Sequence, residues 1–186
     1  MRRHHWKAVR KHPYPKTQTN FYGEFLMTIA VGEQVPSVDI FTFGEQGPEK
    51  VNFAEYCADA KVVLFAVPGA FTPTCSAKHL PGFVEKADAV KAKNVDKIAC
   101  LSVNDAFVMD AWGKEHEAVG RVDLLADGNA DLAKAMGLEF DASGFGLGVR
   151  AKRFAMIIDH GKVTSLEIDE RGEFKETAVE AVLERL

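Results

Sequence analysis

Residues 61–83 read KVVLFAVPGAFTPTCSAKHLPGF, and this stretch decides the fold. Its first part, Val62 to Val67, is a continuous apolar run of strand length, which predicts a strand buried on both faces. A turn-rich link from Pro68 to Pro73 follows, and Thr74-Cys75-Ser76 then opens a predicted helix. One cysteine therefore lies in the first turn of a helix, just beyond the carboxyl end of a strand, where α/β sheets usually carry their chemistry.

Further strands and helices are predicted on both sides of this stretch. The strand patterns cover Val38 to Phe43, Lys97 to Val103, Val122 to Ala126, Phe154 to Asp159 and Val163 to Ile168. The helix patterns cover Ser76 to Asn94, Asp105 to Ala118, Asp131 to Met136 and Thr177 to Arg185. His160-Gly161 predicts a tight hairpin between the last two strands. This order predicts an α/β protein of thioredoxin-like topology, with a central mixed β-sheet flanked by helices.

The remaining segments have weaker patterns. We expect the helix from Ser76 to Asn94 to kink at Pro81-Gly82, because proline removes a backbone N–H and clashes with the preceding turn. Gly44 to Pro48 is interpreted as a turn, and Val51 to Tyr56 as a short helical turn. Residues 137–149 contain four glycines, which favours a long loop.

Charge divides the chain into two parts. The 186 residues make one domain the expectation, and 47% hydrophobic with 27% charged residues is ordinary for a globular protein. Residues 1–26 hold six Lys or Arg and one acid, a net charge of +5, so residues 27–186 carry −9 of the total of −4. We interpret 1–26 as a basic, disordered extension and 27–186 as the domain. An organelle-targeting segment and a binder of anionic surfaces are the alternatives for the extension.

Three widely spaced cysteines do not form a disulfide framework. The chain lacks CxxC and any Cys/His spacing typical of a metal site, so we expect no metal. Free thiols favour a reducing compartment such as the cytoplasm, with organelle import through residues 1–26 left open. No apolar run approaches the roughly 20 residues of a membrane span. The basic residues lack a pattern of stacking aromatics, so nucleic-acid binding is not expected.

Cys75 can be interpreted as a small buried hydrophobe or as a reactive thiol. The flanking hydroxyl residues and the helix start favour the reactive thiol, because free N–H groups and the helix dipole stabilise a thiolate. Thr72 occupies the position that a second thiol would have in a CxxC motif. A hydroxyl cannot form a disulfide, but it can hydrogen-bond an oxygen near the sulfur, which favours single-thiolate attack on an oxygen substrate.

The string PGAFTPTCSAKHLPGF at 68–83 resembles the peroxidatic-cysteine motif of peroxiredoxins, whose core is PxxxTxxC. Together with LSVND at 101–105 and KRF at 152–154, it is similar to the type II, atypical two-cysteine branch. The resemblance runs from about Met27 to the C-terminus. It implies a thiol-dependent peroxidase that reduces hydrogen peroxide and alkyl hydroperoxides without a resident cofactor.

The same resemblance assigns roles to single residues. Cys75 would attack the O–O bond and become a sulfenic acid, while the Thr72 hydroxyl would hydrogen-bond the thiolate and the peroxide. Pro68 would cover the pocket and keep water from the sulfenic acid. The family's arginine falls on Arg153 rather than Arg150. A guanidinium there would favour the thiolate and stabilise charge on the leaving oxygen.

Regeneration of the thiol has two candidate routes. Cys100 matches a family position for a resolving cysteine, 25 residues after Cys75, but its apolar setting in KIACLSV equally favours a buried core residue. A disulfide would require local unwinding of the active-site helix. Otherwise an external donor such as glutathione, glutaredoxin or thioredoxin would reduce Cys75 directly. Cys57 is interpreted as structural, and an imidazolium at His79 that assists the thiolate is a weaker alternative.

Two further function classes remain open at this point. A redox-sensing or binding protein on the same fold would signal through oxidation of Cys75. A thiol-disulfide oxidoreductase is disfavoured by the missing CxxC. The resemblance also implies a homodimer.

Overall fold

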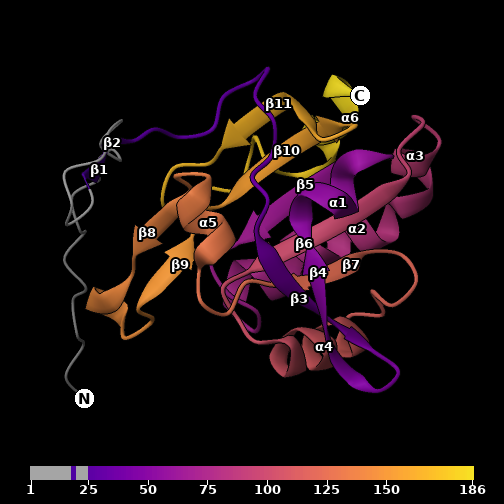
Figure 1. Cartoon of the computed structure of the whole chain (residues 1–186). Helices are drawn as coiled ribbons and strands as arrows, with labels where there is room; N and C mark the ends of the chain where they lie inside the picture. Colours follow the sequence, from indigo (N-terminus) through magenta and orange to yellow (C-terminus); the bar gives the residue numbers. More distant parts are fainter. Residues whose placement is uncertain (1–17, 20–24) are drawn as a thin grey trace, which may run out of the picture.

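The computed structural model describes residues 18–19 and 25–186, so most of the predicted 1–26 extension lies outside the described residues. Within it, Gln18–Thr19 (β1) pairs antiparallel with Phe25–Leu26 (β2). The rest of the described chain is organised around one large sheet (Figure 1).

The central sheet has seven strands in the order β11-β10-β5-β6-β7-β3-β4. Their bounds are Asp39–Gly44 (β3), Gly47–Asn52 (β4), Lys61–Val67 (β5), Lys97–Ser102 (β6), Asp123–Ala126 (β7), Phe154–Asp159 (β10) and Lys162–Ile168 (β11). β5, β6 and β7 are parallel, and every other neighbouring pair in the sheet is antiparallel. The predicted thioredoxin-like α/β fold with a mixed sheet is therefore confirmed.

Helices cover both faces of this sheet (Figure 1). One face packs against Phe53–Ala58 (α1) and Asp131–Ala135 (α5), and the other against the π-helix Cys75–His79 with Leu80–Glu85 (α2), Ala87–Lys91 (α3), Ala106–Glu115 (α4) and Val179–Arg185 (α6). Among the described residues, none of these helices is long and apolar enough to cross a membrane.

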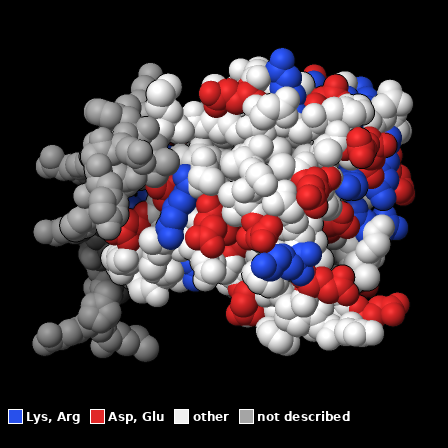
Figure 2. All heavy atoms as spheres, in the orientation of Figure 1, with Lys and Arg blue, Asp and Glu red and all other residues white. Residues whose placement is uncertain are grey.

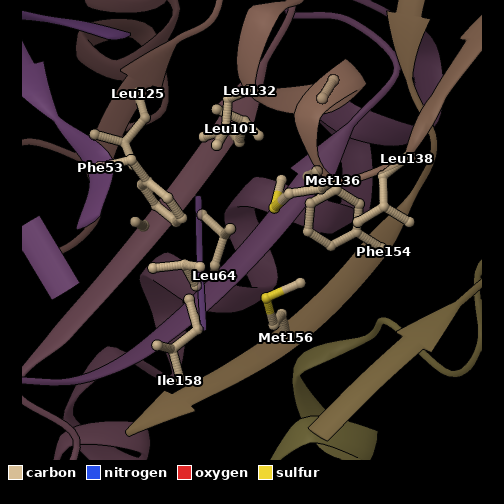
Figure 3. Packing of buried hydrophobic residues seen from close by; sticks show 14 of the residues in the cluster. Phe53, Leu64, Leu101, Leu125, Leu132, Met136, Leu138, Phe154, Met156 and Ile158 are labelled. Carbon is tan, nitrogen blue, oxygen red and sulfur yellow. The ribbon is translucent and has the colours of Figure 1, made fainter. Parts of the chain in front are cut away.

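The predicted burial of β5 on both faces is observed. Val62 and Leu64 belong to the core beneath α1 and α5, whereas Val63 and Phe65 belong to the core beneath the π-helix and α4. Figure 3 shows the first core, in which Leu64 from β5 and Phe154, Met156 and Ile158 from β10 belong to one cluster with Phe53 from α1 and Leu132 from α5. Burying one such Leu or Phe contributes about 1.5–3 kcal/mol, so the strand that leads to Cys75 is held rigidly.

One strand was not predicted from the sequence. Gly47–Asn52 forms β4 and pairs with β3 in a hairpin, and the turn expected over Gly44 to Pro48 is the two-residue tip at 45–46. The helical turn expected over 51–56 is confirmed only from Phe53, where α1 begins. β4 lies at the edge of the sheet and is mostly exposed, so it lacks the apolar alternation that marks a strand. Pro48 is tolerated there because an edge strand has unpaired N–H positions.

The predicted loop over residues 137–149 was also wrong in part. Glu139–Asp141 (β8) and Val149–Ala151 (β9) form a two-stranded antiparallel ribbon, with a 3₁₀ turn at Ser143–Phe145. The φ values of Gly146 and Gly148 are 72° and 67°, a conformation that favours glycine. The glycines therefore mark the tip of a ribbon rather than an unstructured segment.

The predicted helix after Cys75 is built from three pieces. A π-helix precedes α2, and the helical conformation is interrupted at Lys86 (φ −100°, ψ 15°) before α3 begins. Pro81 lies in the first turn of α2, where its missing N–H costs little. The proline thus sits at the junction between π- and α-helical turns instead of kinking a continuous α-helix. The predicted hairpin at His160-Gly161 is confirmed, and the Asp105 side chain caps α4 by accepting from Val108 N.

Candidate active site

Cys75 lies at the predicted place, immediately beyond β5 and at the start of the helical layer. It is the first residue of the π-helix, and helical backbone already begins at residue 73. Its side chain is only 1% exposed and packs within the core beneath that helix. π-helical turns are rare and occur often at functional sites, because the wider turn redirects side chains.

Arg153 reaches the sulfur from the other side of the site. It lies between β9 and β10, where the sequence placed it, 78 positions after Cys75. Its Nη2 donates to Cys75 Sγ at 3.4 Å, and its Nη1 donates to His79 Nδ1 at 2.8 Å. The guanidinium also lies 5.8 Å from the centroid of the Phe174 ring. A positive charge is therefore directed at a buried sulfur.

His79 is buried behind this arginine. Because a guanidinium can only donate, His79 Nδ1 must accept, and the ring proton therefore sits on Nε2. Nε2 donates to the Thr177 carbonyl oxygen at 3.0 Å. Burial, and then the nearby Arg153 charge, lowers the pKa of His79 to about 3. The ring is neutral at physiological pH, so the alternative of an imidazolium that assists the Cys75 thiolate is wrong.

The turn before Cys75 is held by its own hydrogen bonds. The Thr72 hydroxyl donates to the Gly69 carbonyl at 2.7 Å, and the Thr72 carbonyl accepts from Ser76 N at 3.0 Å. A hydroxyl has one proton, so with this bond made Thr72 can only accept a hydrogen bond. Phe71 occupies the left-handed region (φ 59°) and is 51% exposed, which marks a tight turn at the rim of the site.

Arg150 supports the same turn. Its Nη1 donates to the carbonyl oxygens of Pro68 (3.4 Å) and Val103 (3.2 Å), and its Nε donates to the Leu147 carbonyl (2.9 Å). The choice of Arg153 over Arg150 as the residue beside the sulfur agrees with this geometry. Arg150 instead ties the β8–β9 ribbon to the Pro68 turn.

Asn104 was not among the residues predicted for the site. Its Oδ1 accepts from Ala70 N at 3.0 Å and from Ser102 Oγ at 2.7 Å, so it joins the ends of β5 and β6 beneath the site. The only sequence signal was its place within LSVND. A polar side chain at the carboxyl end of a buried parallel strand could have been flagged on that ground.

The other two cysteines lie in apolar surroundings. Cys100 is fully buried in β6, in the same core as Cys75, and burial raises the pKa of its thiol well above the usual range. Burial raises the pKa of Cys57 to about 12. All three cysteines are free thiols in the structure. Within residues 18–19 and 25–186, no group of three His, Cys, Asp or Glu side chains is placed to hold a metal ion.

A cysteine beside a guanidinium, at the start of a helix on a thioredoxin-like sheet, is typical of thiol-based redox proteins. Comparison with known proteins gives the family. The Redoxin family model matches residues 30–183. Peroxiredoxin-2E-2, chloroplastic, of Oryza sativa subsp. japonica is 52% identical over 165 residues, covering 86% of this chain and 73% of the relative. Peroxiredoxin-2B of Arabidopsis thaliana is 46% identical over 159 residues, covering 85% and 98%.

Solved structures agree. The reduced Prx3 of Vibrio vulnificus in complex with hydrogen peroxide has 48% identity and a TM-score of 0.82, covering 85% of this chain and 99% of that one. The chain belongs to the peroxiredoxins, and within them to the type II branch. The protein is therefore a thiol-dependent peroxidase, with a peroxide as substrate and a thiol as reductant.

Proposed function

We propose that Cys75 is the peroxidatic nucleophile of this peroxidase. Its thiolate attacks one oxygen of the hydroperoxide, an S–O bond forms, and the O–O bond breaks. The electron pair of that bond leaves with the second oxygen, which takes up a proton as water or an alcohol. Cys75 is oxidised by two electrons to the sulfenic acid. The contact between Arg153 Nη2 and Cys75 Sγ carries this proposal.

Arg153, Thr72 and Pro68 complete the pocket in this proposal. The guanidinium favours the thiolate and stabilises negative charge on the leaving oxygen. The Thr72 hydroxyl, whose proton goes to Gly69, accepts a hydrogen bond from the O–H of the hydroperoxide. This differs from the donation to the thiolate that the family resemblance implied. The Pro68 carbonyl accepts from Arg150 Nη1, and in this proposal the proline ring limits water access to the sulfenic acid.

Replacing the nucleophile tests this assignment. Cys75→Ser should abolish rapid peroxide consumption in stopped-flow assays, because a hydroxyl of ordinary acidity is a poor nucleophile. Cys57→Ser is the matched control, since its thiol is buried in the other core and should react as the wild type does. Rapid consumption by Cys75→Ser would refute the assignment. Steady-state turnover with a thiol donor further separates an enzyme from a redox sensor, which would react once.

The external thiol donor is proposed to act on Cys75 directly, without a resident cofactor. The burial of Cys100 and the raised pKa of its thiol support this route, because the neutral thiol is a weak nucleophile. Cys100→Ser should then retain turnover with glutathione and glutaredoxin. Loss of turnover with every donor, together with a Cys75–Cys100 disulfide in the oxidised wild type, would make Cys100 the resolving cysteine.

Further partners and location are also proposals. We infer a homodimer, to be tested by sedimentation of the full chain. On the face in Figure 2, acidic and basic side chains are interspersed over the described residues, which supports the absence of a nucleic-acid partner.

The free thiols are compatible with the cytoplasm. The chloroplastic names of two relatives are compatible with organelle import through the basic residues 1–26, and fusing those residues to a fluorescent protein decides between the two.

A further inference from the structure

His79 touches Arg153 but lies outside the reaction chemistry described above. Its Nδ1 accepts from Arg153 Nη1 at 2.8 Å, while the neighbouring Nη2 of the same guanidinium donates to Cys75 Sγ at 3.4 Å. The two terminal nitrogens are joined by one rigid, planar group. Fixing the first nitrogen on His79 therefore fixes the direction of the second toward the sulfur.

The imidazole is itself held from behind. Its Nε2 donates to the Thr177 carbonyl, and Asp169 accepts hydrogen bonds from Thr177 Oγ1 at 2.7 Å and from Glu176 N at 2.8 Å. The backbone N–H of Asp169 donates a hydrogen bond to the Arg153 carbonyl oxygen at 3.0 Å. The loop between β11 and α6 thus closes a ring of hydrogen bonds through His79 to Arg153.

Aromatic rings fix the plane of the imidazole. Phe65 lies 4.8 Å away and Phe174 5.0 Å away between ring centroids. With no space to rotate and both nitrogens bonded, the ring has one orientation and one tautomer. A buried polar group that is fully hydrogen-bonded in this way specifies a unique geometry.

The neutral state of the ring has a chemical consequence. A carboxylate in place of His79 would also orient Arg153, but it would form an ion pair and neutralise the charge that faces Cys75. A neutral acceptor holds the guanidinium and leaves its positive charge for the sulfur and the leaving oxygen. The low pKa of His79 keeps this acceptor uncharged across the physiological range.

We propose that His79 is a positioning residue of the peroxidase reaction, which acts as an acceptor fixed by Thr177 and Asp169 to aim Arg153 at Cys75. This inference rests on the proposed role of Cys75. It assigns no proton transfer to His79, and its effect on the rate passes entirely through Arg153.

Two amide substitutions separate the two nitrogens of the ring. In His79→Asn the side-chain oxygen takes the place of Nδ1 and can still accept from Arg153, whereas His79→Gln extends an amide to the place of Nε2 and loses that acceptor. Both variants lose the aromatic ring, and His79→Gln keeps one methylene more than His79→Asn. We expect His79→Gln to react with peroxide about tenfold or more slowly than His79→Asn, since hydrogen bonds to charged groups are strong. Equal rates in the two variants would overturn the proposal.

A double-mutant cycle tests the path through Arg153. In an Arg153→Leu background, His79→Gln should have no further effect on the rate of reaction with peroxide, because the guanidinium that His79 orients is absent. Full additivity would show a merely structural role and contradict the proposal. His160→Asn is the control, because His160 is exposed at the opposite end of β10 and should keep the wild-type rate. Cys75→Ser is run alongside, so that a failure of the nucleophile assignment is seen separately.

One measurement needs no substitution. The ¹⁵N NMR shifts of His79 in the reduced wild-type protein at pH 7 report the tautomer and the charge. The expected spectrum is that of a neutral ring protonated at Nε2. A charged ring, or a proton on Nδ1, would leave no acceptor for Arg153 and would overturn the proposal even if the His79 variants fail to fold.

Discussion

At the residue scale, one guanidinium has to serve both the sulfur and the histidine. Arg153 contacts Cys75 and His79 through two different nitrogens, and its guanidinium carbon lies 5.8 Å from the centroid of the Phe174 ring. A lysine would supply the charge as a single point and could not reproduce both directions at once. The site therefore depends on the planar geometry of the guanidinium, and not on its charge alone.

Substitutions at Arg153 separate charge from geometry. Arg153→Leu should slow the reaction with peroxide about 10²-fold, the loss typical when one preorganised donor to a developing oxyanion is removed. Arg153→Lys should recover only part of this rate, because its ammonium cannot bond His79 and Cys75 in one fixed plane. Stopped-flow peroxide consumption measures both. Recovery of the full rate by lysine would show that charge alone suffices.

Contiguous residues were predictable from the sequence, whereas contacts across the chain were not. Pro68, Thr72 and Cys75 stand in one motif at fixed spacing, and a family resemblance was enough to find Arg153. The position of His79 was noticed, but its role depends on Thr177, which lies 98 positions away and contributes only a backbone carbonyl. Such a partner leaves no trace in side-chain identity, so the neutral, accepting state of the ring could not be deduced.

At the element scale, one hydrogen bond fastens α4 to the candidate active-site helix. Trp112 is fully buried in α4, and its Nε1 donates to Ser76 Oγ in the π-helix at 2.9 Å. Formation of a Cys75–Cys100 disulfide would require this helix to unwind, and the bond would then break. The contact therefore resists the movement that would bring the two cysteines together.

Removing this bond should weaken the packing of the helix. Ser76→Ala leaves the buried Trp112 N–H without its partner, which costs about 1–3 kcal/mol of unfolding free energy. Urea denaturation measures the loss, and hydrogen exchange should become faster over residues 75–85. In a Trp112→Phe background the same substitution should cost much less. An equal cost in both backgrounds would show that the bond does not hold the helix.

Elements with a strong apolar pattern were predictable, and weakly patterned ones were not. β5 and β6 are buried on both faces and appear as unbroken apolar runs. β4 and the β8–β9 ribbon are exposed or short, and their stability comes from pairing with neighbours that the sequence does not reveal locally. No propensity scale marks the π-helical turn at Cys75–His79.

At the scale of the whole molecule, the neutral His79 links stability to pH. An imidazole titrates near 6.5 when exposed, but burial and Arg153 lower the pKa of His79 to about 3 in the folded state. Between these values the unfolded chain binds the proton and the folded chain does not. The contribution of His79 to the free energy of unfolding is therefore fully present above pH 6.5 and decreases as the pH falls toward 3.

Acidification should show this loss directly. From pH 7 to pH 5 the histidine is expected to remove about 2 kcal/mol of unfolding free energy. Urea denaturation of the wild type and of His79→Asn at both pH values isolates its share, since an asparagine does not titrate. The variant should lose less stability than the wild type over this interval. Parallel losses would mean that His79 is protonated in the folded protein.

The central claim is that Cys75 is the thiol that peroxide oxidises. One equivalent of hydrogen peroxide is added to the reduced full chain in the presence of dimedone, which traps sulfenic acids, and the adduct is located by peptide mass spectrometry. The account predicts a dimedone adduct on Cys75, with Cys57 and Cys100 unmodified. An adduct on either of the other cysteines, with Cys75 left as a thiol, would contradict it.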